Sequence, residues 1–201
     1  MSRNSRYAAA ALLAGAALAL AAGSPAAQPR SCTVPGSRTV YANTEVRVFT
    51  RVDPSDFTTR TVACRKLDGA RFKLAQDRRD YTQEKVEHFS RAGRRLGYAV
   101  LVNGRSATTG RACALNLDSG RRRCAGTLLV RGIGITPAGS IAWLADVGMD
   151  ERCCTVRKLD AGATQQVELD FGFDIDRASF AVGGTHIYWT KAGQPKSATM
   201  P

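Results

Sequence analysis

A repeated unit constrains the fold of this chain more than any other feature. Each copy has an apolar segment, a variable polar loop, and a second segment that ends in a Leu-Asp turn. The turns lie at 67–69 (LDG), 117–120 (LDSG) and 159–162 (LDAG), and the apolar segments begin near residues 47, 98, 141 and 187. Self-similarity every forty to fifty residues is typical of β-propeller blades.

The apolar segments also indicate strands that are covered on both sides. The only two Trp residues, Trp143 and Trp189, stand in two of these segments, each following a Gly and a small hydroxyl residue. In a strand, Ile141, Trp143 and Ala145 share one face and the two residues between them share the other. Both faces are apolar, which favours a strand packed between two neighbouring layers.

These patterns predict an all-β, β-propeller-like fold with about four repeats in a single domain, residues 28–201. The repeats are expected at 37–77, 83–127, 128–171 and 175–201. The last repeat lacks a fourth strand, and the N-terminal segment SCTVPG is one candidate to complete it and close a ring. An incomplete four-unit wheel and a β-sandwich built from the same hairpins remain alternatives.

The first 27 residues are expected to form a signal peptide. Arg3 and Arg6 precede an apolar run of small residues that is too short for a comfortable membrane span. Cleavage is expected between Ala22 and Gln28, leaving a secreted or envelope-associated protein without a stable membrane span. Loss of the two arginines lowers the formal net charge from +12 to +10. Such a charge favours anionic neighbours.

All six Cys residues follow the signal peptide, and an even number in an exported chain indicates disulfides. Cys32 is expected to pair with Cys64, in the third strand of the first repeat. Cys113 and Cys124 flank the LDSG hairpin, where a two-residue turn would set them opposite each other. Two options are left for Cys153 and Cys154: they pair with each other, which is slightly favoured, or with a partner protein.

Three consecutive arginines, Arg121, Arg122 and Arg123, are the candidate binding residues. They stand at a hairpin, and their guanidinium groups suit phosphate or sulfate, although a bare solvated hairpin is the favoured interpretation. No aromatic residues are interleaved for base stacking, so nucleic acid is not expected as a partner.

The residues that enzymes and metal sites use do not form a recognisable motif. His88 and His186 are the only histidines, no G-x-S-x-G sequence accompanies them, and no C-x-x-C occurs. The acidic residues at 168–176 lack calcium-loop spacing. No catalytic residue, cofactor or metal site is therefore predicted.

The sequence also resembles a family. The segments PGSRTVYAN, AWLAD, VRKLDAG and IYWTKAGQPKSATM are similar to those of exported, largely uncharacterised bacterial repeat proteins related to TolB or WD40-like propeller domains. The resemblance covers nearly all of the chain after the signal peptide and implies a propeller fold, but it brings no catalytic residues. The chain departs from true WD40 repeats in having no Trp-Asp dipeptide.

Together these observations predict an exported, non-catalytic module that binds an anionic or protein partner in the envelope or the medium. The alternative is a secreted hydrolase or lyase that acts on a glycan at the mouth of the propeller channel.

Overall fold

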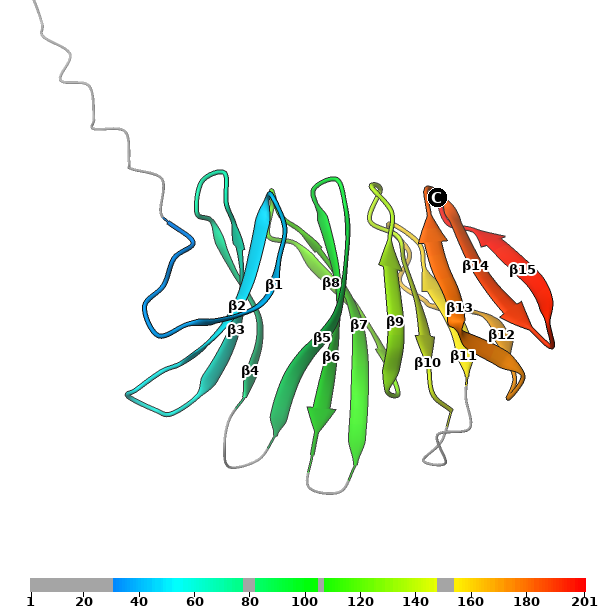
Figure 1. The fold of residues 1–201 in the computed structure, drawn as a ribbon, viewed down its shortest axis with the longest axis horizontal. Coiled ribbons are helices and arrows are strands. Elements are labelled where there is room, and N and C mark those ends of the chain that lie inside the picture. Colours follow the sequence, from blue (N-terminus) through cyan, green and yellow to red (C-terminus); the bar gives the residue numbers. More distant parts are fainter. Residues whose placement is uncertain (1–30, 78–81, 105–106, 148–153) are drawn as a thin grey trace, which may run out of the picture.

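The computed structural model describes residues 31–77, 82–104, 107–147 and 154–201. The predicted signal peptide lies outside these residues. The described part of the chain is all-β, as predicted, and contains fifteen antiparallel strands in four sheets (Figure 1). None of the described segments forms a helix that could cross a lipid bilayer.

Each sheet is a meander whose strands pair in chain order. The first sheet contains β1 (Arg38–Ala42), β2 (Val46–Val52), β3 (Thr59–Arg65) and β4 (Arg71–Asp77). The second contains β5 (Gln83–Ala92), β6 (Arg95–Asn103), β7 (Thr108–Asn116) and β8 (Arg122–Thr127). The third contains β9 (Val130–Ile135), β10 (Ile141–Ala145), β11 (Thr155–Leu159) and β12 (Val167–Phe171). The fourth contains β13 (Ile175–Gly183), β14 (His186–Lys191) and β15 (Gln194–Thr199).

The sheets stand side by side in chain order (Figure 1). Apolar side chains fill the space between each pair of neighbouring sheets. Both faces of strand β10 are apolar because the strand lies between two such layers of apolar side chains. Trp143 lies in the layer shared with the second sheet, whereas Leu144 lies in the layer shared with the fourth, and both are buried. The alternation expected from the sequence of residues 141–145 is therefore present.

The two Trp residues occupy corresponding places in successive sheets. Each lies in the second strand of its sheet and donates its indole N–H to the last strand of the sheet before it. Trp143 Nε1 donates to Thr127 Oγ1 at 3.1 Å, and Trp189 Nε1 donates to Asp170 Oδ2 at 2.7 Å. Tyr98 of β6 is buried against the first sheet in the same way. The repeated sequence pattern thus encodes a repeated contact between sheets.

The hairpin turns follow the Leu-Asp pattern, with a longer loop than expected in the second sheet. Gly69, Gly120 and Gly162 have φ values of +69°, +70° and +83°, which glycine adopts without steric cost. Between β7 and β8, the Asn116 N–H donates to the Arg121 carbonyl at 2.9 Å, so these two residues enclose a loop of four residues, 117–120. Within it, the Gly120 N–H donates to the Asn116 carbonyl at 2.9 Å. The prediction of a two-residue turn was wrong. The strand register is nevertheless the predicted one, because the four-residue loop is centred on the same two residues and leaves Cys113 opposite Cys124.

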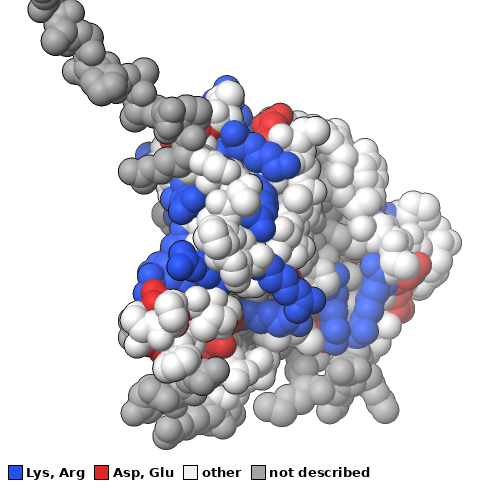
Figure 2. Space-filling view, turned by 60° about the vertical axis from the view of Figure 1, so that its left-hand side comes forward, with Lys and Arg blue, Asp and Glu red and all other residues white. Residues whose placement is uncertain are grey.

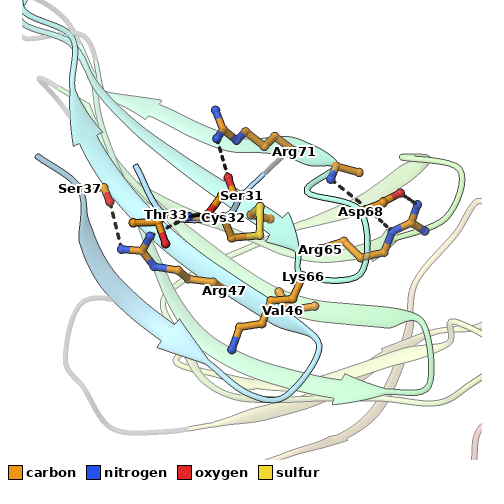
Figure 3. Close-up of a disulfide and its surroundings, with 12 residues drawn as sticks. Ser31, Cys32, Thr33, Ser37, Val46, Arg47, Arg65, Lys66, Asp68 and Arg71 are labelled. Atoms are coloured by element: carbon orange, nitrogen blue, oxygen red, sulfur yellow. Dashed lines mark hydrogen bonds and ion pairs between the residues drawn. A yellow bond between two sulfur atoms is a disulfide. The ribbon is translucent and has the colours of Figure 1, made fainter. Parts of the chain in front are cut away.

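Two of the expected disulfides are present. Cys113 and Cys124 are direct partners in the β7–β8 register and are bonded, as are Cys32 and Cys64 (Figure 3). Cys154 is also disulfide-bonded, and its candidate partner Cys153 lies outside the described residues.

The N-terminal segment does not complete the fourth sheet. The Cys32–Cys64 disulfide and a hydrogen bond from Arg47 to the Cys32 carbonyl at 2.6 Å hold it on the outer face of the first sheet instead, as Figure 3 shows in part. Val34 packs there against Phe49. The fourth sheet keeps three strands, with β15 at its edge.

Candidate functional site

The arginines singled out in the sequence lie in and next to the turn between β7 and β8. In a four-stranded meander, the turns after the first and third strands lie at the same end. The β5–β6 and β7–β8 turns of the second sheet therefore stand together, between the corresponding turns of the first and third sheets. A groove opens on each side of them.

The groove between the second and third sheets has a volume of about 320 Å³. It is formed by the start of β6, the β7–β8 hairpin, and the two turns of the third sheet. Its lining residues are Arg95, Ala114, Leu115, Asn116, Arg121, Arg122, Arg123, Ala138, Gly139, Ala161 and Gly162. We call it the unpaired groove, because none of these lining residues is a carboxylate.

The three predicted arginines do not act together. Strand alternation directs Arg122 toward the first sheet, where it donates to the Leu74 carbonyl at 3.0 Å. Arg123 points the other way and donates to the carbonyls of Asp160 and Ala163, both at 3.0 Å, and of Gly139 at 3.2 Å. Arg122 and Arg123 thus join the second sheet to its two neighbours.

Arg121 remains available, and a residue that the sequence reasoning missed joins it. Arg95 pairs with Asn116 in the β6–β7 register, so it faces the same side as the groove. Its guanidinium lies beside the backbone of Gly139: a β-carbon built on this glycine would be 3.4 Å from Arg95 Nε. Neither Arg95 nor Arg121 makes a side-chain hydrogen bond or ion pair with the part of the chain that the structure describes. The hairpin register could have identified Arg95, because it stands opposite the residue that opens the LDSG turn.

Arg123 retains its charge while bonding to carbonyl groups, so three guanidinium groups border one groove. The nearest acidic residue in the third-sheet turn is Asp160, whose carboxylate accepts a hydrogen bond from Lys158 at 2.8 Å. The uncompensated charge creates a positive potential there. Guanidinium groups bind carboxylate, phosphate and sulfate oxygens through paired N–H donors. The groove is therefore built to attract an anion.

The groove on the other side, between the first and second sheets, has a volume of about 390 Å³. Its lining residues are Glu45, Val46, Arg65, Leu67, Arg91, Gly93, Arg94 and Leu117. We call it the paired groove, because each of its three arginines contacts a carboxylate. Asp118 binds Arg65 at 2.6 Å and Arg94 at 2.7 Å. Arg91 binds Glu45, and Arg65 also binds Asp68.

The ion pair between Arg65 and Asp68 shifts the pKa values of both partners. The hydrogen bond from Arg65 is the largest cause that lowers the pKa of Asp68 to about 2. The same bond raises the pKa of Arg65. Asp118 is the one carboxylate of the β7–β8 turn, and it is held on the paired side. This placement is why the unpaired groove has no counter-charge.

The other chemically reactive side chains do not converge. His88 lies in the second sheet and His186 in the fourth, so the two histidines are in different sheets. Glu168 binds Arg157 at 2.8 Å, and Asp170 binds Lys191 and Trp189. Burial alone would raise the pKa of Asp170, but the hydrogen bonds from Lys191 and Trp189 outweigh it and lower the pKa. Within the described ranges, no three Cys, His, Asp or Glu side chains are grouped closely enough to hold a metal ion.

Comparisons of the chain with models of protein families, with curated proteins and with solved structures returned no match. The two disulfides are consistent with an extracellular location.

Proposed function

We propose that this protein is an exported binding module that holds an anionic group in the unpaired groove. The partner is an acidic polymer or an acidic protein surface of the cell envelope or the surrounding medium. The observation that carries the proposal is the pair Arg95 and Arg121, which border the groove with no acidic residue among its lining. Arg123 adds a third positive charge.

The proposed architecture is a row of propeller-like blades. Four meanders stacked face to face, with repeated aromatic contacts from each second strand to the preceding sheet, support this arrangement. Propellers bind ligands through the loops at one end of the blades. The unpaired groove lies among such turns, where neighbouring sheets meet.

The chemistry of the groove favours binding over glycan cleavage. Glycoside hydrolysis uses two carboxyl groups on opposite sides of the scissile bond. The residues that line the unpaired groove offer guanidinium groups, one amide and small apolar side chains instead. A sulfate, phosphate or carboxylate group with a small part of its carrier fits a groove of about 320 Å³.

The test compares the affinity of the protein for three polymers: polygalacturonate, polyphosphate and neutral dextran. We expect both charged polymers to bind and dextran not to bind. Affinity should fall as the Debye length shrinks from roughly 30 to 8 Å with added salt. The double variant Arg95→Gln/Arg121→Gln should lose about tenfold or more in affinity, the effect of removing charge-assisted hydrogen bonds.

A matched control separates the groove from general charge attraction. Arg38 and Lys196 are exposed and make no side-chain hydrogen bond or ion pair in the described ranges, so Arg38→Gln/Lys196→Gln removes the same charge elsewhere. It should change affinity by about twofold at most. Equal losses of affinity in the two double variants would show that binding depends only on the net charge of the protein, and would contradict the proposal.

A further inference from the structure

A second candidate site lies on the outer face of the first sheet, away from both grooves. This face carries many arginines, and Figure 2 shows Lys and Arg side chains gathered on the side of the molecule that includes it. Among them is a pocket of about 200 Å³. Its lining residues, which define the Phe49 pocket, are Val34, Phe49, Arg51, Asp53, Arg60, Val62 and Arg71.

The pocket occupies a position that a neighbouring sheet fills elsewhere in the molecule. In the later sheets, the second strand presents Tyr98, Trp143 or Trp189 to the sheet before it. In the first sheet, β2 presents Phe49 to the same side, where the N-terminal segment at 31–37 covers it in the described part of the chain. The short segment covers less area than a sheet, and an apolar pocket remains between Val34, Phe49 and Val62.

The N-terminal segment is held firmly enough to form a wall. The Cys32–Cys64 disulfide fixes it to β3, and Arg47 donates to the Cys32 carbonyl at 2.6 Å and to Ser37 Oγ at 3.0 Å (Figure 3). The Arg47 guanidinium also lies over the Phe49 ring, 5.0 Å from its centre. The apolar part of the pocket is therefore preformed.

The edge of the Phe49 pocket is cationic. Arg60 is shared by Asp53 at 3.1 Å and Asp56 at 3.4 Å, and Arg71 donates to the Ser31 carbonyl at 2.9 Å. Arg51 makes no side-chain hydrogen bond or ion pair with any residue that the structure describes. The lining thus holds three guanidinium groups and one carboxylate around an apolar centre, which suits a ligand with an apolar body and a negative end.

We propose that the Phe49 pocket binds a carboxylate attached to a single ring or a branched apolar group, with Arg51 as the anion contact. The volume is below the roughly 300–1,000 Å³ of pockets for drug-sized ligands, so it suits one such group. Two sources share this chemistry: a free aromatic acid, and the carboxyl-terminal residue of a polypeptide. This site goes beyond the binding proposed for the unpaired groove and does not depend on it.

The experiment follows the methyl signals of Val34 and Val62 by NMR during titration. The probes are 3-phenylpropionate, the neutral 3-phenylpropanamide, and the peptide Ala-Ala-Phe with a free or an amidated carboxyl terminus. We expect the two carboxylates to shift both methyl signals and to bind about tenfold more tightly than their amides. Tighter binding of the free peptide than of phenylpropionate identifies a polypeptide end as the ligand, and the reverse order identifies a free acid.

Two variants complete the test. Arg51→Gln should weaken phenylpropionate binding about tenfold while leaving the backbone spectrum of the rest of the chain unchanged. Arg121→Gln, in the unpaired groove, should leave this binding unaltered, so failure of one site is distinguishable from failure of the other. Equal binding of acid and amide would overturn the proposal. So would methyl shifts that depend on protein concentration without any probe, because they would make the pocket a contact between copies of this chain.

Discussion

The two grooves on either side of the second sheet differ in charge pairing although the same hairpins build them. Each of the three arginines that line the paired groove binds a carboxylate, whereas four arginines and no carboxylate line the unpaired groove. The difference arises because Asp118, in the turn that the grooves share, binds arginines on one side only. Ion pairs in the paired groove stabilise the contact between the first and second sheets. The positive charge of the unpaired groove is available to a ligand.

The largest expected effect comes from reversing one charge in each groove. Arg121→Glu should lower the affinity for polyphosphate by about thirtyfold, because it removes a charged donor and adds repulsion. It should leave the melting temperature almost unchanged, since Arg121 makes no side-chain bond with the described residues. Arg94→Glu should instead lower the melting temperature, because Arg94 binds Asp118, and should weaken polyphosphate binding by about threefold or less. Isothermal titration calorimetry and thermal melts of both variants test this contrast.

A second change would convert the paired groove into an anion site. Asp118→Asn with Glu45→Gln removes the carboxylates that bind Arg94 and Arg91, whereas Arg65 keeps its bond to Asp68. The number of sulfate ions bound per chain should therefore rise from one to two. The free energy of unfolding should fall by about 1 kcal/mol or less, because the carboxylates of both substituted residues are exposed to solvent. Adding Arg95→Gln/Arg121→Gln to this variant should return the number to one. A stoichiometry that stays at one in the first variant would show that unpaired arginines alone do not create a site.

The smallest expected effect is a change in melting temperature with pH. It distinguishes the two grooves because the Asp68 carboxylate beside the paired groove titrates at low pH, whereas the cationic groups of the unpaired groove are arginines. The pKa of Asp68 is depressed to about 2, so the stability that its ion pair contributes is present above the unfolded value near 3.8 and is lost as pH falls through about 2. The melting temperatures of the wild type and Asp68→Asn should therefore differ above about pH 5 and converge below about pH 2. Sulfate binding in the unpaired groove should stay constant from about pH 5 to 8, because its cationic groups are arginines. A difference in melting temperature that persists at pH 1.5 would contradict the assignment of Asp68.

Local pattern predicted the architecture of the sheets, and contacts between sheets account for what it missed. Alternating apolar residues identified β10 as a strand covered on both sides, and the symmetry of the LDSG hairpin predicted the Cys113–Cys124 disulfide. Nothing local distinguishes Arg121 from Arg122 and Arg123. Their roles depend on which carbonyl groups the neighbouring sheets present. Arg95 was missed for a related reason, since it comes close to Arg121 only through the register of two strands.

The position of the N-terminal segment also could not be predicted from local sequence. Its proline and its small residues suited an edge strand as well as a loop, so the gap in the fourth sheet was a reasonable destination. The disulfide to Cys64 and the carbonyl and hydroxyl groups that Arg47 binds decide its position on the first sheet instead.

The central claim is that Arg95 and Arg121 hold an anion, and the signals of their own side chains test it most directly. Titration with sodium sulfate, at constant ionic strength, can be followed by NMR of the arginine Nε–Hε groups. We expect saturable shifts for Arg95 and Arg121 and none for Arg65 and Arg94, which already bind Asp118. Saturable shifts of all four signals, or shifts of Arg65 and Arg94 alone, would contradict it.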